Sequence, residues 1–128
     1  MKQKKEDNLS NPFECLSAYT LEPFQFIGGT LQELTFDVYD SASAPLDLSN
    51  ATCYWVMSPY GNPQYATLTI NGVKKGSVIN QFLVTVSGSS TATLQGKYTH
   101  QPVVLDYNGK EYRPSQGVLI ILGRNATV

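Results

Sequence analysis

The sequence predicts an all-β fold, an antiparallel β-sandwich of about seven or eight strands with a tyrosine corner and an extended N-terminal arm. Short runs with apolar residues at alternate positions recur along the chain, separated by clusters of Gly, Pro, Asn, Asp and Ser. No helical stripe longer than one turn is present. The run Leu94-x-Gly96-x-Tyr98 stands just before an extended segment. Sandwiches build a tyrosine corner with a tyrosine placed in this way.

The chain divides into an arm and one domain. At 128 residues it fits a single domain, which we place at residues 21–128. Residues 1–20 are expected to form an N-terminal arm that is flexible or bound to a partner. Its start, MKQKKEDN, is charged and lacks periodicity. Phe13, Leu16 and Tyr19 then appear without regular alternation, so the segment is either a solvated leader or an arm that lies across a neighbouring subunit.

The first half of the domain shows three strand patterns. Phe24–Ile27 is a short run that Gly28-Gly29 stops. The next two runs alternate, and the residues expected on their buried faces are Leu34, Phe36 and Val38, followed by Ala51, Cys53, Trp55 and Met57. The turn formers in SPYGNP predict a loop after the third run.

The second half continues the alternation. A strand is expected up to Ile70, with Asn71-Gly72 as a hairpin turn. Phe82, Val84 and Val86 are expected on the buried face of the next strand. Pro102 cannot donate to a ladder, which implies a bulge or an edge position there. Asn108-Gly109 predicts a second hairpin.

Trp55 and Tyr98 are the fold markers of the sequence, together with Leu94 and Gly96. Trp55 lies on the third expected strand, and Tyr98 precedes the penultimate long one. Immunoglobulin-like domains place their core tryptophan and corner tyrosine at these points. The residue two positions after Tyr98 is His100 instead of cysteine. We therefore expect an immunoglobulin-like sandwich without the inter-sheet disulfide, which suits a reducing compartment.

The last strand, GVLIIL, is apolar at every position after its glycine. If Val118, Ile120 and Leu122 face the core, Leu119 and Ile121 face outward and need a cover. That cover is either the N-terminal segment or a second copy. The candidate assembly interface predicted in this way comprises Phe13, Leu16, Tyr19, Leu119 and Ile121.

No set of residues has the spacing of a catalytic or metal site. His100 is the only histidine, and a lone histidine in an apolar-flanked strand is usually a satisfied core side chain. The carboxylates at strand ends and turns are explained by turn capping: Asp37, Asp40, Asp47 and Asp106. We expect no enzyme activity, no cofactor and no metal.

Charge and hydropathy restrict the partners. The net charge is −1 and no basic face is apparent, so nucleic acid is not expected as a partner. No apolar run approaches the roughly 20 residues of a membrane helix. The stretch MKQKKEDNLSNPFE has basic residues but no apolar segment behind them. Synthesis in the cytoplasm and no association with membranes are expected.

The tyrosines leave one alternative open, because eight of them on a sandwich could form a platform for stacking sugars. The members in or near loops or on the expected outer face are Tyr54, Tyr60, Tyr65, Tyr107 and Tyr112. Cross-strand packing on the outer faces explains the same residues. A carbohydrate-binding or host-adhesion module, with a host-surface glycan as its ligand, is therefore the alternative function.

From Phe24 onward, about 100 residues resemble the immunoglobulin-like N-terminal domain of baseplate upper proteins from phages of Gram-positive bacteria, and related small virion proteins. The likeness lies in FDVYDSASAPLDLSNATCYWVMSPYGN, SVINQFLVTVSG and TATLQGKYTHQPVVLDYNGKEYRPSQG. Its main features are the PLDLSNA step into a strand that ends at a Pro/Gly turn, and T-x-x-L-x-G-x-Y before a D-x-N-G-K hairpin.

The resemblance implies a non-enzymatic structural part of a bacteriophage virion. Members of that family assemble symmetrically, so the implied partners are further copies of the chain or other phage structural proteins. Baseplate upper proteins continue into a coiled or fibrous region, whereas this chain ends soon after the domain. A tail or baseplate part, a connector, and a capsid-decorating or head-fibre part all stay open.

Overall fold

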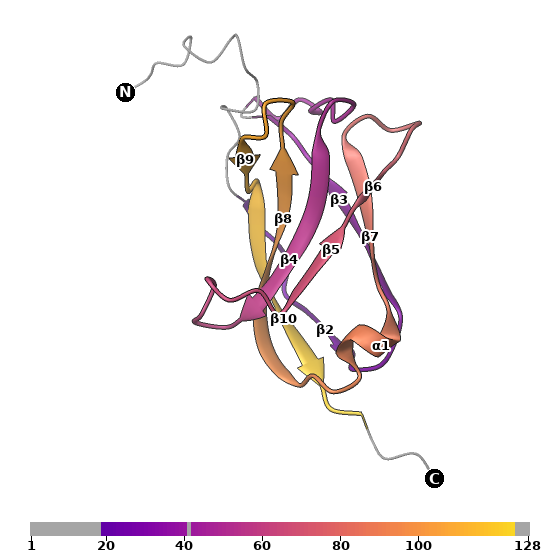
Figure 1. Ribbon diagram of the computed structural model, residues 1–128, viewed down its shortest axis with the longest axis vertical. Coiled ribbons are helices and arrows are strands. Elements are labelled where there is room, and N and C mark those ends of the chain that lie inside the picture. The colour runs from indigo at the N-terminus through magenta and orange to yellow at the C-terminus, as the bar shows by residue number, and fades with distance from the viewer. Residues whose placement is uncertain (1–18, 41, 125–128) are drawn as a thin grey trace.

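The computed structural model describes residues 19–40 and 42–124 as a β-sandwich (Figure 1). In chain order the elements are β1 (Tyr19–Thr20), β2 (Phe24–Ile27), β3 (Gln32–Asp37), β4 (Thr52–Pro59), β5 (Leu68–Asn71), β6 (Val73–Lys74), β7 (Gln81–Val86), α1 (Gly88–Thr91), β8 (Gly96–Leu105), β9 (Glu111–Tyr112) and β10 (Ser115–Leu122). Within the described residues, no helix is long and apolar enough to cross a bilayer. The predicted all-β fold is confirmed.

The two sheets have the strand arrangement of an immunoglobulin-like domain. The larger sheet has the order β1-β10-β8-β4-β5, with β2 also on β10 and β9 on β8. The smaller sheet has the order β3-β7-β6. In immunoglobulin lettering, β4, β8 and β10 correspond to strands C, F and G, and β3, β7 and β6 to B, E and D. β5 takes the place of the additional strand C′ beside C.

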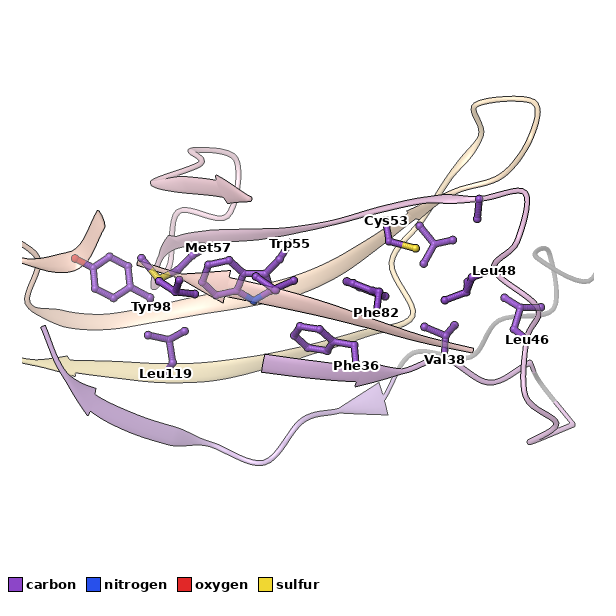
Figure 2. Packing of buried hydrophobic residues seen from close by; sticks show 14 of the residues in the cluster. Phe36, Val38, Leu46, Leu48, Cys53, Trp55, Met57, Phe82, Tyr98 and Leu119 are labelled. Carbon is purple, nitrogen blue, oxygen red and sulfur yellow. The ribbon is translucent and has the colours of Figure 1, made fainter. Parts of the chain in front are cut away.

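The core lies between the sheets and follows the alternation in the sequence. Trp55, Phe82 and Met57 are fully buried, and Figure 2 shows their side chains between the ribbons of the two layers. Among the described residues, the buried members of the cluster are Phe26, Phe36, Val38, Leu46, Leu48, Ala51, Cys53, Trp55, Met57, Phe82, Val84, Val86, Tyr98, Val104, Leu119 and Ile121. The inward faces predicted for β3, β4 and β7 are confirmed.

The tyrosine corner forms as predicted. The Tyr98 hydroxyl donates a hydrogen bond to the Gln95 carbonyl, 3.3 Å away, and Leu94 packs against the core. Gly96 between them has φ 118°, a conformation that side chains with a Cβ rarely adopt. The glycine thus provides the bend that brings the phenol back over the turn after α1.

Asn71-Gly72 does not form the predicted hairpin. β5 pairs with β4 in the larger sheet, whereas β6 pairs with β7 in the smaller one, so the chain changes sheets at Gly72. The Gly72 amide donates to the Cys53 carbonyl at 2.8 Å, and a Cβ at Gly72 would collide with the Phe82 ring. A glycine is needed here because the backbone passes close to the Phe82 ring. An Asn-Gly pair in the sequence does not distinguish this requirement from a hairpin turn.

The hairpin predicted at Asn108-Gly109 is confirmed, since Asp106 N donates to Lys110 O at 3.0 Å and β9 pairs with β8. Pro102 lies on β8 in the gap between the residues that pair with β10 and those that pair with β9. There the register with β10 reaches His100, and the register with β9 begins at Val104. A missing backbone donor is tolerated at such a position.

The N-terminal edge differs from the prediction in two ways. β1 and β2 pair parallel with β10, so the sandwich is not antiparallel throughout. Parallel neighbours need a long connection, and the rest of the domain provides it. Backbone pairing also begins at Tyr19, opposite Ser115, two residues before the expected domain start. Phe13 and Leu16 lie outside the described residues.

The orientation expected for the last strand is wrong. Leu119 and Ile121 are buried in the core, so they are not an outward assembly surface. Ile120 and Leu122 face outward instead, with 36% and 40% of their surfaces exposed. Because both parities of this strand are apolar, alternation could not decide its direction. Pairing decides it, since Leu119 stands opposite the inward-facing Tyr98.

We expect Tyr98→Phe to lower the free energy of unfolding by about 1 kcal/mol, because it removes one partly buried hydrogen bond. Urea denaturation at equilibrium measures the change. Tyr107→Phe is the matched control, since Tyr107 is 69% exposed, and its effect should stay within about 0.5 kcal/mol. Equal losses in the two variants would show that the corner hydroxyl contributes nothing specific.

Candidate functional site: the outer face of the larger sheet

The outer face of β10 and β2 carries a strip of apolar side chains. Val118, Ile120 and Leu122 point outward from β10, and Ile27 stands opposite Leu122 on β2. Ile27 is 49% exposed, so the strip reaches the edge strand with much of its surface uncovered. We call these four residues the outer stripe. Within the described residues, β2 pairs only with β10, so its other edge is open.

The stripe is bordered by one amide side chain and one cationic side chain. Ile120 lies between Gln25 on β2 and Lys97 on β8. The Lys97 ammonium is directed over the Tyr60 ring, 4.0 Å from its centroid. This cation–π contact holds the charge beside the stripe. A partner that covers the stripe would bury apolar surface next to the Lys97 ammonium.

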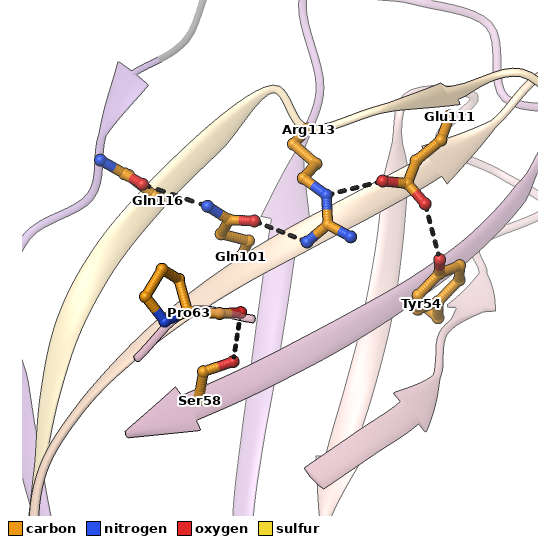
Figure 3. Close-up of polar contacts among 7 residues, drawn as sticks. All are labelled: Tyr54, Ser58, Pro63, Gln101, Glu111, Arg113 and Gln116. Atoms are coloured by element: carbon orange, nitrogen blue, oxygen red, sulfur yellow. Dashed lines mark hydrogen bonds and ion pairs between the residues drawn. The ribbon is translucent and has the colours of Figure 1, made fainter. Parts of the chain in front are cut away.

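Farther along the same face, five polar side chains form a hydrogen-bonded chain (Figure 3). The Tyr54 hydroxyl donates to one carboxylate oxygen of Glu111 at 3.2 Å, and Arg113 Nε donates to the other at 2.7 Å. Arg113 also donates to Gln101 Oε1 at 2.7 Å, and the Gln101 amide donates to Gln116 at 3.1 Å. Each of the five side chains therefore has at least one hydrogen-bond partner within the network.

A groove of about 380 Å³ adjoins this network, and its lining residues are Tyr54, Val56, Pro63, Gln64, Ala66, Thr69, Asn71 and Arg113. The loop after β4 closes one side, where the Ser58 hydroxyl donates to the Pro63 carbonyl at 3.3 Å (Figure 3). Partial burial, and then the nearby Glu111 carboxylate, raises the pKa of Tyr54. Tyr54 is therefore a neutral hydroxyl at physiological pH.

The tyrosines do not gather into one platform. Among the five residues considered for sugar stacking, only Tyr54 lines the groove. Tyr60 is engaged by Lys97, and Tyr107 is exposed at the turn between β8 and β9. Of the tyrosine platform expected from the sequence, the groove contains one aromatic side chain, Tyr54, beside polar groups.

His100 is a core residue whose imidazole accepts a hydrogen bond from Trp55. The indole Nε1–H donates to His100 Nδ1 at 2.9 Å, so the imidazole proton must reside on Nε2. Nε2 is buried and has no hydrogen-bond partner among the described residues. Burial lowers the pKa of His100 to about 4. A neutral imidazole sealed under Leu21 and Gly117 is not placed to exchange protons with a substrate.

The other reactive groups have structural roles. Burial raises the pKa of the Cys53 thiol to about 11, which keeps it a neutral core side chain. Asp40, Asp47 and Asp106 accept backbone N–H groups within their own turns, as the sequence predicts. Within the described residues, no three His, Cys, Asp or Glu side chains converge on a metal position.

Sequence reasoning missed the Tyr54–Glu111–Arg113 network. Glu111 and Arg113 are two residues apart after the Asn-Gly turn, so their side chains share a face. That spacing was a usable signal for the ion pair. The pairing of β9 with β8, which brings Glu111 to Tyr54 across 57 positions of sequence, was not predictable from spacing.

No protein-family model and no curated protein sequence matches the chain. Among solved structures, the chain is similar to the crystal structure of CopC from Methylosinus trichosporium OB3b, with a TM-score of 0.48 and 4% sequence identity. That alignment covers 83% of this chain and 89% of the CopC chain.

Stability should fall in mild acid because of His100. Its pKa is about 4 when folded against the usual 6.5, so the unfolded chain binds more protons between these values. The stabilisation that comes from keeping His100 neutral is fully present above pH 6.5 and is lost as the pH falls towards 4. The loss amounts to about 3 kcal/mol at 1.36 kcal/mol per pKa unit. Denaturant unfolding at a series of pH values measures it.

His100→Gln provides the comparison, because an amide oxygen can still accept from the indole but does not titrate in this range. Carboxylates contribute equally to both proteins, so the difference between the two pH profiles isolates the imidazole. Parallel profiles between pH 6.5 and 4 would show that His100 is not buried as a neutral base.

Proposed function

We propose that this chain is a non-enzymatic structural component of a bacteriophage virion that acts through protein–protein assembly. Tail or baseplate, connector, and capsid-decorating or head-fibre positions all fit this role. The observation that carries the proposal is the outer stripe, an apolar surface that none of the described residues covers, on a domain whose described core packs between the two sheets. Such a surface favours association with another protein.

Several titratable groups that the structure describes have structural roles. The imidazole of His100 is sealed in the core, the Cys53 thiol is neutral and buried, and three turn carboxylates are engaged by backbone amides. The exposed Arg113–Glu111 pair belongs to the surface network.

The second candidate is carbohydrate binding, and one observation favours it. The groove places Tyr54 beside the polar side chains of Gln64, Asn71 and Arg113. An aromatic ring beside amide and guanidinium donors is a common arrangement for holding a small polar ligand. The stripe, however, would have no role in that function.

The first test is the composition of virions. In purified particles of a phage that encodes this chain, mass spectrometry should detect it at a fixed copy number that matches the symmetry of the tail, the connector or the capsid. Absence of the chain from intact particles would overturn the proposal.

The second test separates the two candidates. Trp55 has no exposed surface, so its fluorescence would not report a ligand in the groove, and calorimetric titration against a broad glycan panel is the suitable measurement. We expect no heat of binding. A signal that Tyr54→Ser removes, while Tyr107→Ser retains it, would favour the carbohydrate-binding function instead.

A further inference from the structure

We propose that residues 21–23, beside β10, form a cover over His100 that acid opens. When the imidazole takes up a proton it leaves the core past Gly117, and β1 detaches from β10 while the two sheets stay folded. The inference goes beyond the proposed assembly function and does not depend on it. It follows from the place of His100 Nε2, the gap in backbone pairing beside it, and the hydrogen bond between Nδ1 and Trp55.

The unpartnered nitrogen of His100 lies next to the covering segment. Gly117 stands opposite His100 in the register of β8 with β10, and a Cβ placed on this glycine would lie 3.0 Å from Nε2 and 2.8 Å from the Leu21 Cβ. Leu21 is only half-buried, although it packs against the core cluster. A glycine and a half-buried leucine thus lie beside the imidazole nitrogen that no described residue engages.

Backbone pairing along β10 is interrupted at the same place. β1 ends opposite Gln116, the Leu21 amide donates to the Gln116 carbonyl at 2.7 Å, and β2 begins only at Phe24. Residues 22 and 23 belong to neither strand, and Pro23 has no N–H to donate. β1 itself has two residues. A short edge element with few hydrogen bonds opens at a lower free energy than the central strands.

A protonated His100 does not fit its present surroundings. The lone pair that would take the proton is on Nδ1, which accepts the indole N–H of Trp55 at 2.9 Å. Protonation turns Nδ1 into a donor that faces another donor, so this hydrogen bond is lost. The rings of Phe24 and Phe36, with centroids 5.4 Å and 6.4 Å away, offer no oxygen or nitrogen acceptor. An imidazolium with both N–H groups unsatisfied is far more stable in water.

The described neighbours of the imidazole carry no charge that could hold the proton in place. Phe24, Phe36 and Trp55 face it from β2, β3 and β4, and β10 contributes Gly117. Burial alone lowers its pKa to about 4. The inward-facing titratable groups on the same strands are the Cys53 thiol and the Tyr98 hydroxyl, which donates to the Gln95 carbonyl. The charged residues on or beside these elements are exposed: Glu22, Glu33, Asp37 and Lys97.

The difference in pKa between the closed and open forms determines the size of the effect. In the closed form the pKa of His100 is about 4, and in an open form that gives the ring to water it returns to the usual 6.5. The open form therefore binds the proton more tightly, and acid favours it. Between pH 7 and pH 5 the ratio of open to closed molecules should rise about twentyfold.

Amide hydrogen exchange of the full-length protein, followed by NMR, measures this opening. The protection factor, which corrects for the intrinsic effect of pH on exchange, should fall about twentyfold for the Leu21 amide between pH 7 and pH 5. Trp55 is the only tryptophan, and its indole N–H should show the same fall, because it loses its acceptor in the same opening. Equal protection of Leu21 at the two pH values, or a fall at Leu21 that the indole does not share, would overturn the proposal.

Low concentrations of urea separate local opening from global unfolding. Local opening exposes little surface, so urea should leave the protection of Leu21 nearly unchanged. The Val38 amide, which donates to the Asn80 carbonyl at 2.9 Å beyond the end of β3, is the comparison and should lose protection as urea increases. If both amides respond to urea equally steeply, the proton acts through global unfolding and residues 21–23 are not a separate cover.

His100→Gln is the matched variant, because its amide oxygen can accept from the indole but does not titrate. In this variant the protection of Leu21 should be the same at pH 7 and pH 5. A fall as large as in the wild-type protein would assign the effect to another group and contradict the proposal. None of these results bears on the virion role, which is tested by the composition of purified particles.

Discussion

The structure depends most on the contact between Trp55 and His100. Immunoglobulin domains join strands B and F by a disulfide against which the core tryptophan packs. Here His100 occupies the strand F position, hydrogen-bonds the indole at 2.9 Å, and lies 6.4 Å from the Phe36 ring of strand B, centroid to centroid. A ring cluster thus replaces the covalent link. It is indifferent to redox conditions but requires a neutral imidazole, and burying an Nε2–H that has no partner among the described residues has a cost.

The same contact determines which face of the last strand is exposed. Tyr98 and His100 point inward from β8, and the register with β10 then directs Leu119 into the core. Because successive side chains of a strand point to opposite faces, Ile120 and Leu122 then face outward. The outer stripe is therefore a geometric consequence of the core. The apolar character of the stripe does not follow from the core, because β10 could pack Leu119 and Ile121 equally well with polar residues at its outward-facing positions.

The sequence predicted those features in which one local rule decides the outcome. Alternation identified the buried faces of β3, β4 and β7, and the Leu-x-Gly-x-Tyr spacing identified the corner. Prediction from the sequence failed where two different structures require the same residue pattern. Asn71-Gly72 satisfies both a hairpin and a close crossing between sheets, and GVLIIL satisfies either orientation of the strand. Only pairing between distant segments resolves such cases, as it does for Tyr54 and Glu111.

The outer face has two halves that differ in what a partner would have to displace. The Tyr54–Glu111–Arg113 chain includes a charged pair whose side chains are 40% and 43% exposed, so covering it would strip water from charged groups. Covering Ile120 and Leu122 releases water at no such cost. An associating protein would therefore gain its free energy at the stripe. The polar network beside it would act mainly against misplaced partners, because a shifted partner would bury the Arg113–Glu111 pair without compensation.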